Sequence, residues 1–313
     1  MKPPLFSIVI PMYNRQREIR RAVESCLAQR FGDFEVIVVD DASQDDSAAV
    51  VASYSDPRIK LVRHEQNRGE CPARNTGVAA SLGEWVVFLD SDHALKPGSL
   101  SVIRCYIERE GGNVDRFGFM YEWDTGIFSP DPAPDGSVLD YEGWMRFAQT
   151  ARNSDTLLCT RRSTFACVVW PDSSAAPTEY HLDFARKFKT RLIPELLAIE
   201  YTDAANRLTA SRVRSARERI LRRAGHDMES MERILRNHGA ALRRYAPQRH
   251  ETIYRVFVLS TFIRREWLSG LHRAQGYFTS CHLTFNGAAS IALAAIWPEA
   301  YLTVRHLKAS RAH

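Results

Sequence analysis

The segment Trp85-Val-Val-Phe-Leu-Asp90-Ser-Asp92-His93 runs from five apolar residues directly into two carboxylates separated by one residue. A buried strand that ends in acids places them at the carboxyl edge of a sheet, where α/β proteins bind their ligands. Two hard oxygen donors at that edge suit Mg²⁺ or Mn²⁺ bound through the phosphates of a substrate. Such a pair alone more often just begins a loop, because short motifs match by chance. The metal-site interpretation therefore depends on the sequence upstream.

The first hundred residues alternate strand and helix signals around this segment. Short buried strands are predicted over residues 6–10, where Pro11 stops the run, and over residues 34–39. A shorter strand is expected at residues 59–63, and apolar residues at helical spacing lie between the strands. Alternation of this kind predicts an α/β protein with a mostly parallel sheet and helices on both faces.

After the first hundred residues the alternation weakens, with strands expected at residues 117–123, 156–160 and 192–199. Residues 201–313 are Arg-rich and show helical spacing. They hold 19 Lys and Arg against 8 Asp and Glu, a net charge of +11, whereas residues 1–200 have a net charge of −6. We therefore predict an α/β domain over residues 1–200 and a basic, helical accessory region over residues 201–313.

The composition is that of a globular protein. Hydrophobic residues make up 45% of the 313 residues and charged residues 25%, which is enough to bury a core. Six cysteines lack paired spacing, which argues against a zinc site or a disulfide framework and for reduced thiols. The N-terminus lacks the apolar stretch of a signal peptide, and no apolar run reaches the roughly 20 residues of a membrane span. We expect a cytoplasmic protein.

Five blocks of sequence follow one another across residues 6–100. They are Phe6-Ser-Ile-Val-Ile-Pro-Met-Tyr-Asn14, Val39-Asp-Asp-Ala-Ser43, Asn67-Arg-Gly69, Ala73-Arg-Asn-Thr-Gly77 and Gly83-Glu-Trp-Val-Val-Phe-Leu-Asp-Ser-Asp92, with Pro97 downstream. In order and interval the blocks resemble the family 2 glycosyltransferases of the GT-A fold, over about a third of the chain. The resemblance implies that residues 1–200 form a Rossmann-like catalytic domain. Such a domain binds a nucleotide-sugar, here most simply a UDP-sugar, and transfers the sugar with inversion.

The resemblance assigns the nucleotide pocket to residues near the ends of the first strands. Asp41 would accept hydrogen bonds from a uracil N–H or a ribose hydroxyl, and Pro11 and Tyr13 would line the same pocket. Helix capping is the alternative for Asp41, with Ser43 as a competing cap. Arg74 would pair its guanidinium with phosphate or carboxylate oxygens. Its alternative is a solvated place on an exposed helix face.

The two acids Asp90 and Asp92 would have different roles at a divalent cation. The resemblance makes Asp92 the direct ligand of Mn²⁺ or Mg²⁺, while Asp90 reaches the ribose, or the metal through water. Ser91 between them belongs to the nucleotide-binding set. Such a cation neutralises charge on the departing nucleoside diphosphate. His93 stands where the family usually has a third acid, so its imidazole either adds a metal ligand or hydrogen-bonds to phosphate or water.

An inverting transfer also needs a base that takes the proton from the acceptor hydroxyl. In the resembled family this base comes from an acidic pair, usually Glu-Asp, at the start of a helix well downstream of the metal motif. The segment Thr178-Glu179-Tyr180-His181-Leu182-Asp183 fits that place, with Tyr180 instead of the usual Asp. We take Glu179 as the base and Asp183 as the reserve, and Asp172 is a third candidate. The alternative for Glu179 and Asp183 is an N-terminal charge favoured by the helix dipole.

The remaining candidates concern the acceptor and other partners. Trp123 and Asp124 are candidates for acceptor contact, because aromatic rings offer the apolar surface that sugar C–H groups match, although Trp is more often a core residue. The basic residues 201–313 either solvate helices or contact the anionic inner face of a membrane. We favour peripheral membrane contact, since residues 253–278, which include Trp267, suit a helix lying in the interface. The chain resembles no nucleic-acid motif, so no nucleic-acid partner is expected.

Taken with the resemblance, the sequence predicts a metal-dependent inverting glycosyltransferase that moves a sugar from a nucleotide-sugar to a hydroxyl of a surface glycan or a lipid-linked saccharide. Two alternatives stay open. A sugar nucleotidyltransferase would share the sheet and the metal, but the glycine-rich, lysine-containing loop of that class is missing after the first strand. A non-catalytic, membrane-associated protein that binds nucleotide-sugars would account for Tyr180 in place of the acid.

Overall fold

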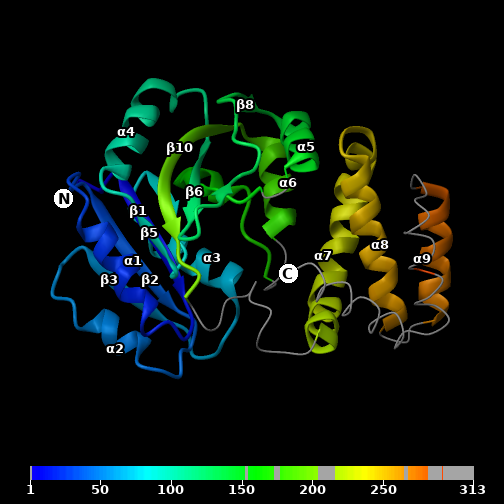
Figure 1. Cartoon of the computed structure of the whole chain (residues 1–313), viewed down its shortest axis with the longest axis horizontal. Helices are drawn as coiled ribbons and strands as arrows, with labels where there is room; N and C mark the ends of the chain where they lie inside the picture. Colours follow the sequence, from blue (N-terminus) through cyan, green and yellow to red (C-terminus); the bar gives the residue numbers. More distant parts are fainter. Residues whose placement is uncertain are drawn as a thin grey trace. The chain divides into compact units, whose positions relative to one another are not determined.

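The computed structural model describes residues 2–151, 154–172, 177–203, 216–263, 267–280 and 291. The chain divides into two compact units, Met1–Arg207 and Leu208–His313. The first unit is an α/β domain, and the described part of the second is helical (Figure 1).

A mixed sheet forms the centre of the first unit. In spatial order its strands are β3 (Ile59–Arg63), β2 (Phe34–Asp40), β1 (Phe6–Met12), β4 (Trp85–Phe88), β9 (Leu157–Arg161), β6 (Arg116–Trp123), β10 (Thr190–Glu200) and β5 (His93–Leu95). Strands β3, β2, β1 and β4 run parallel, and β6 is parallel to β10, whereas β9 is antiparallel to both of its neighbours. Two short strands lie off this path, β7 (Phe128–Ser129) beside β6 and β8 (Val138–Leu139) beside β10. The predicted mostly parallel α/β fold is confirmed.

Helices cover both faces of the sheet (Figure 1). On one face lie α1 (Glu18–Leu27), α2 (Ser47–Ala52) and α4 (Ser99–Glu110), and on the other lie α3 (Glu70–Ala80), the 3₁₀ helix η1 (Arg162–Ala166) and α6 (Pro177–Lys187), with α5 (Tyr141–Thr150) packed against α6. Strand side chains alternate between the two cores, so that in β1 Ile8 and Ile10 belong to the first and Val9 to the second. Helices α3 and α6 therefore contribute side chains to the same second core, although they are far apart in sequence.

Strand β1 continues past Pro11, where we predicted its end. Pro11 pairs with Val39 of β2, and the strand ends at Met12. Pairing with β4 reaches only Val9, whose carbonyl accepts from the Leu89 N–H at 3.0 Å. In a strand, the backbone N–H and carbonyl groups of alternate residues point toward the same neighbouring strand. The backbone polar groups of Pro11 therefore point toward the β4 side, as those of Val9 do, but at a level that β4 no longer reaches. Proline lacks an N–H, and at this position no ladder bond needs one.

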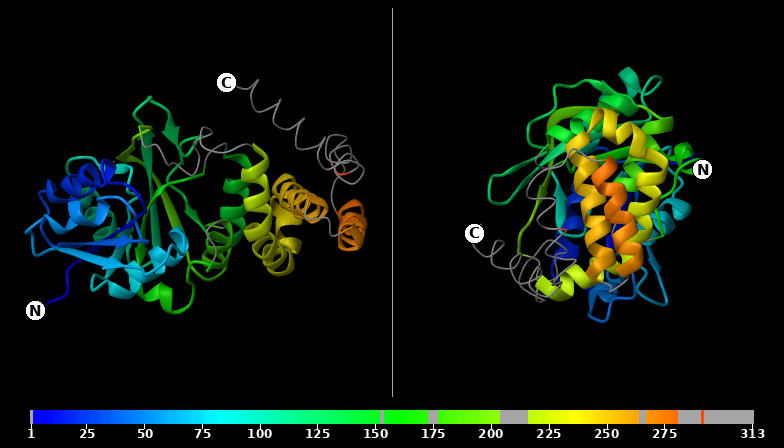
Figure 2. Two further views of the ribbon diagram at one scale, coloured as in Figure 1. Left: turned by 90° about the horizontal axis from the view of Figure 1, so that it is seen from below. Right: turned by 90° about the vertical axis from the view of Figure 1, so that its right-hand side faces the viewer.

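The described part of the second unit consists of three helices, α7 (Ala216–Tyr245), α8 (Pro247–Ile263) and α9 (Trp267–Ser280). Helix α8 packs against both α7 and α9 (Figure 2). Buried side chains such as Leu242, Phe262 and Tyr277 form the core of this unit. Among the described residues, no helix combines the length and the hydropathy that crossing a bilayer requires.

Candidate active site

The carboxyl ends of β1, β2 and β4 meet at one edge of the sheet. The Asp41 N–H donates to the Met12 carbonyl at 2.8 Å, which holds the residue after β2 beside the end of β1. Asn14 and Ala42 have φ angles of 52° and 63°, an uncommon conformation that turns the chain sharply after both strands. Asp90 follows β4 at the same edge. Ligands of α/β sheets bind outside this edge.

Asp40 closes the turn after β2. Its side chain is fully buried, and its Oδ1 accepts from the Ser43 N–H at 2.9 Å. Its Oδ2 forms an ion pair with Arg63 Nε at 2.9 Å. Both oxygens are thus used within the protein, so Asp40 is a structural residue of this edge.

Asp41 organises the loop that follows β3. Its carboxylate accepts the backbone N–H groups of Arg68 at 2.9 Å and Gly69 at 2.7 Å, and lies 2.7 Å from His64 Nδ1. An ionised carboxylate only accepts, so His64 Nδ1 carries the proton of that bond. Two carboxylate oxygens accept about four bonds, which leaves capacity for one more at this 3% exposed residue. The sequence did not indicate this loop-holding role, and the nucleotide contact of Asp41 stays a prediction.

Other predicted residues lie around the same edge. Pro11 is buried in β1, whereas Tyr13 just beyond it is 39% exposed, and Ser91 is buried between the two acids. Asp172, the third candidate for the base, is 80% exposed and lies 3.5 Å from Arg68 Nη2. It therefore lies beside the loop that Asp41 holds.

Asp90 forms an ion pair with Arg74 of α3. Arg74 Nη2 lies 2.9 Å from Asp90 Oδ1, and the same nitrogen also pairs with Glu70, one helical turn earlier. Burial disfavours the charged form of Asp90, but the positive charges of Arg74 and His93 outweigh it and lower the pKa of Asp90. The solvated alternative for Arg74 is wrong, since its side chain is only 12% exposed. In this structure its partners are carboxylates, and a contact with phosphate stays a prediction.

Asp92 and His93 are held against the end of β10. His93 pairs with Glu200 in the antiparallel β5–β10 ladder, and its Nε2 lies 3.5 Å from Glu200 Oε2 and 3.9 Å from Asp92 Oδ1. The Tyr201 N–H donates to the Asp92 carbonyl at 3.0 Å. Burial, and then the charge of Asp90, raise the pKa of Asp92. Burial alone would lower the pKa of His93, but the carboxylates around it, led by Glu200, outweigh burial and raise it.

Three further carboxylates at this edge, Glu70, Asp155 and Glu200, were not predicted. Arg74 lowers the pKa of Glu70, but burial and the nearby carboxylates together raise it. Burial, and then the charge of Asp90, raise the pKa of Asp155, which precedes β9. Of the three, only Glu200 could have been found from the sequence, because it is an acid that directly follows a predicted strand. Glu70 and Asp155 reach the edge through the packing of distant segments, which sequence spacing does not show.

The edge fits a divalent cation by its donor chemistry. Among the described residues, no group of three or more His, Cys, Asp or Glu side chains is arranged to hold a metal ion. A Mg²⁺ or Mn²⁺ ion bound through one or two carboxylates and substrate phosphates needs fewer protein ligands. Asp92 and Asp90 offer such a pair of oxygen donors.

Glu179 and Asp183 lie one turn apart on α6. Glu179 is 7% exposed and Asp183 is half-buried. Tyr180 belongs to the second core: it is 1% exposed, and its ring stacks on Trp170 with centroids 3.7 Å apart and planes at 19°. A carboxylate at position 180 would lie among aromatic rings beside the buried Arg116, and the stack on Trp170 would be lost. The missing acid of the family pattern therefore has a packing reason, and the roles of Glu179 and Asp183 stay predictions.

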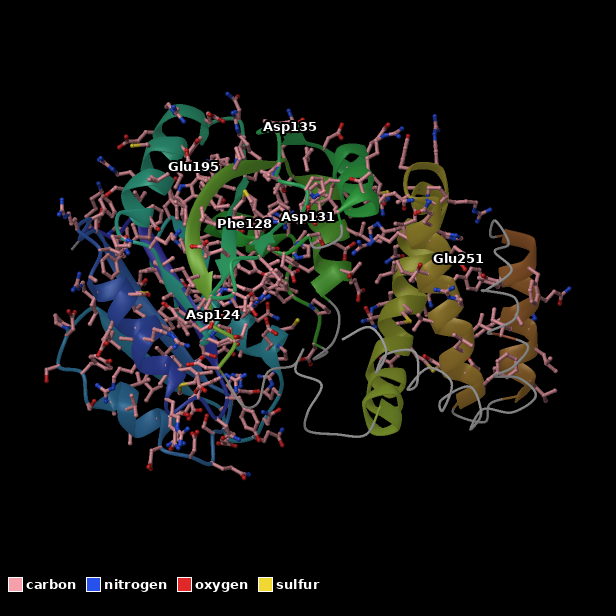
Figure 3. All side chains as sticks on the ribbon, viewed as in Figure 1. Asp124, Phe128, Asp131, Asp135, Glu195 and Glu251 are labelled. Atoms are coloured by element: carbon pink, nitrogen blue, oxygen red, sulfur yellow. The ribbon has the colours of Figure 1, made fainter. Side chains whose placement is uncertain are left out.

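Trp123 and Asp124 lie at the end of β6, beside the end of β10. The Trp123 ring packs against the first core and meets the Tyr121 ring at 5.8 Å between centroids, as a core residue does. The Asp124 N–H donates to the Glu200 carbonyl at 2.9 Å, close to the end of β10 (Figure 3). The Asp124 carboxylate accepts from Thr202 N–H and Oγ1 at 3.1 and 2.9 Å. Asp124 thus fixes the chain after β10, and its contact with an acceptor stays a prediction.

Comparison with known proteins identifies related sequences and a related fold. Succinoglycan biosynthesis protein ExoO of Rhizobium meliloti (strain 1021) is 44% identical over 108 residues, which are 34% of this chain and 30% of that protein. UDP-Glc:alpha-D-GlcNAc-diphosphoundecaprenol beta-1,3-glucosyltransferase WfgD of Escherichia coli is 40% identical over 88 residues, 28% of this chain and 35% of that protein. The matched segments thus span about a third of these relatives.

Among solved structures, S. aureus TarS 1-349 in complex with UDP-GlcNAc superposes with a TM-score of 0.57 at 17% sequence identity, over 89% of this chain and 93% of that chain. At this identity the likeness concerns the fold, and it agrees with the GT-A architecture predicted from the sequence. The family model described as Glycosyl transferase family 2 matches residues 7–183, which are more than half of the chain. The protein belongs to glycosyltransferase family 2.

Proposed function

We propose that this protein is a metal-dependent inverting glycosyltransferase that uses a UDP-sugar and extends a lipid-linked or surface saccharide. The observation that carries the proposal is the sheet edge, where Asp92 and Asp90 follow β4 beside Arg74. Family membership supports it, and so do two of the related proteins. The name of WfgD specifies UDP-Glc and an acceptor linked to diphosphoundecaprenol, and the TarS structure contains UDP-GlcNAc.

In the proposed reaction the acceptor oxygen bonds to the anomeric carbon while the bond from that carbon to the diphosphate oxygen breaks. UDP leaves with the bonding electrons, and Glu179 takes the proton of the acceptor hydroxyl. Asp92 and Asp90 would hold Mn²⁺ or Mg²⁺, which when bound neutralises negative charge on the diphosphate. Arg74 adds a fixed positive charge at the same edge, and Asp41 orders the loop after β3.

Release of UDP tests this proposal. The full chain is incubated with a panel of UDP-sugars and a polyprenyl-diphosphate saccharide, with MnCl₂, with MgCl₂ or with EDTA. We expect release only with a divalent cation, and a loss of about 10²-fold or more for Asp92→Asn, since several kcal/mol of charge stabilisation depend on the metal. Asp33→Asn, at an exposed position before β2, is the matched control and should keep the full rate. Full activity of Asp92→Asn, or full activity in EDTA, would overturn the proposal.

We also propose that the helical unit contacts an anionic membrane surface. Leu268, Leu271 and Phe278 of α9 are 85, 59 and 42% exposed. Their spacing of three and seven residues places them on one face of the helix. Residues 201–313 carry a net charge of +11, and an exposed apolar helix face in a basic region suits an anionic bilayer surface. The side chain of Trp267, which we had included in this face, lies outside the described residues.

Sedimentation with lipid vesicles tests the membrane contact. Binding should be strong to vesicles that contain phosphatidylglycerol, weak to pure phosphatidylcholine, and reduced by salt, because screening weakens the attraction between charges. Equal binding to both kinds of vesicle, or binding to neither, would contradict the contact.

A further inference from the structure

Three flat side chains form a column that joins α3 to α6. The guanidinium carbon of Arg74 lies 4.6 Å from the Trp170 ring centroid, and the Trp170 ring stacks on Tyr180 with centroids 3.7 Å apart. Trp170 and Tyr180 are each 1% exposed. Cation–π contacts and ring stacks depend on geometry, so a shift of one member disturbs its neighbour.

Trp170, in the middle of the column, is fixed from several sides. Asn75 of α3 donates from Nδ2 to the Trp170 carbonyl at 2.8 Å, and its Oδ1 accepts the Trp170 N–H at 3.0 Å. The Phe88 ring of β4 meets the Trp170 ring edge to face at 5.5 Å, and the Phe165 ring lies parallel to the Tyr180 ring at 6.3 Å. The centre of the column is therefore a rigid part of the second core.

One end of the column lies at the carboxylate edge. Arg74 Nη2, on the guanidinium that covers Trp170, contacts Asp90 Oδ1 at 2.9 Å and pairs with Glu70. The group that stacks on Trp170 is thus also the group that compensates the first acid after β4.

The other end of the column lies beside the candidate base. Tyr180 directly follows Glu179 in the first turn of α6, and both are buried. Helix α6 also has a further anchor in the fully buried Arg116, which donates to Thr190 Oγ1 at 3.0 Å and to His181 Nδ1 at 3.1 Å and lies 6.0 Å from the centroid of the Tyr180 ring. Removing the Tyr180 ring therefore leaves α6 attached to the sheet and changes mainly the placement of its first turn.

We propose that the column of Arg74, Trp170 and Tyr180 positions Glu179 relative to Asp90, so that Tyr180 is a positioning residue for sugar transfer. This inference rests on the proposed function. It gives the departure from the family pattern a role: the ring at position 180 replaces a second acid and holds the base in register with the donor site. Tyr180 is then no sign of a protein that has lost catalysis.

Three substitutions at position 180 separate the ring from the hydroxyl and from charge. Tyr180→Phe keeps the ring and removes only the hydroxyl, which lies beside Arg116 and Thr160, so kcat should stay within about twofold of wild type. Tyr180→Leu removes the stack. Because a misplacement of about 1 Å can cost about 10²-fold, its kcat should fall by about 10- to 100-fold, with the donor KM little changed. Tyr180→Asp restores the usual family residue, yet should be at least as slow, because a carboxylate cannot stack on Trp170, even with the buried Arg116 beside it.

A double substitution tests whether Tyr180 acts through Glu179. Tyr180→Leu should lower kcat by about 10- to 100-fold in the wild-type background but by less than about twofold in Glu179→Gln, where no base remains to be misplaced. Ile103→Ala, in the first core on the opposite face, is the control for lost stability and should leave kcat at 25 °C unchanged. An equal loss from Tyr180→Leu in both backgrounds would overturn the inference, and so would a rate increase in Tyr180→Asp.

Failure of the proposed function would look different. A wild-type protein that releases no UDP from any donor would refute the proposed enzymatic function. The structural role of the column can still be measured separately, by the exchange of the α6 backbone N–H groups with deuterated water. Exchange in the first turn of α6 should be faster in Tyr180→Leu and unchanged in Tyr180→Phe. Unchanged exchange in Tyr180→Leu would overturn the column as a support of α6.

Discussion

Replacement of Arg74 by Gln should destabilise the first unit, and more strongly at neutral than at acidic pH. Arg74 contacts both Asp90 and Glu70. The carboxylates of Asp92 and Asp155 also lie close enough to influence Glu70 and Asp90. Without the guanidinium, four acids share one region with less positive charge, and repulsion between them opposes folding.

The cost follows from the exposure of the partners. Removing one member of a fully buried ion pair costs about 3–5 kcal/mol. The Arg74 side chain is 12% exposed, but those of Asp90 and Glu70 are 41% and 32% exposed, so water screens part of the interaction. We therefore expect a loss of about 2 kcal/mol in the free energy of unfolding at pH 7. For a domain of roughly 200 residues this lowers Tm by about 4–8 °C.

The pH dependence follows from the directions of the pKa shifts. Although burial opposes its charged form, Asp90 has a lowered pKa in the folded protein. Its ion pair with Arg74 therefore stabilises the fold above its unfolded pKa of about 3.9, and this contribution is lost as the pH falls through the folded pKa. Glu70 and Asp92 have raised pKa values, so they take up protons first and relieve the repulsion in the variant. The difference between wild type and Arg74→Gln should shrink as the pH falls from 7 toward 4.

Thermal unfolding of both proteins at pH 7, 5 and 4 measures this difference. Arg20→Gln on α1 is the control, because the Arg20–Glu24 pair is 3.8 Å long with both side chains more than half exposed, and should cost less than about 0.5 kcal/mol. An Arg74→Gln variant with the wild-type Tm at pH 7 would refute the reasoning. A loss of the same size at pH 7 and pH 4 would refute the electrostatic origin.

Other substitutions test separate parts of the structure. Gly77→Ala should cost about 1–3 kcal/mol in urea unfolding, because its Cβ would collide with a β1 side chain, whereas Gly112→Ala points into open space and should change stability by less than about 0.5 kcal/mol. Equal stability of the two would contradict the close packing of α3 on β1. Asp41→Asn should cost about 1–3 kcal/mol in the free energy of unfolding, because the Asn side chain has one oxygen and so cannot accept both the Arg68 and the Gly69 N–H as the two carboxylate oxygens do. Exchange of the backbone N–H groups in the loop after β3 with deuterated water should also become faster. Unchanged exchange there would be evidence against the loop-holding role. Leu268→Ser should weaken binding to phosphatidylglycerol vesicles, whereas Leu82→Ser, 61% exposed in the first unit, should not; the same loss from both would argue against a contact through α9.

The sheet could be predicted because its strands are encoded locally. Continuous apolar runs bounded by charged or turn-forming residues mark buried strands. The strand predicted at residues 59–63 coincides with β3, and the one at residues 34–39 misses only Asp40. The predicted end of β1 at Pro11 was wrong. Proline is tolerated there because β4 stops pairing with β1 at Val9, which the sequence of β1 does not show.

The neighbours of each site residue could not be predicted in the same way. Asp41 bonds to Arg68 and Gly69 across a whole strand–loop unit, and Glu200 meets His93 through an antiparallel pairing of two distant strands. Such register depends on tertiary packing rather than on local spacing. In the sequence, Tyr180 is noticeable only as a residue that stands where the resembled family usually has an acid. Its stacking on Trp170, which gives the residue a physical role, is visible only in the structure.

Binding of UDP in the presence and absence of Mn²⁺, measured by titration calorimetry, tests most directly whether Asp92 and Asp90 hold a cation at the donor diphosphate. For the wild-type protein we predict that saturating Mn²⁺ tightens UDP binding by at least about tenfold, or 1.4 kcal/mol. In Asp92→Asn this gain should disappear while weak metal-free binding persists, and in Asp33→Asn it should remain. A wild-type protein that binds UDP equally well with and without Mn²⁺, or an Asp92→Asn variant that keeps the full gain, would contradict the proposed metal site.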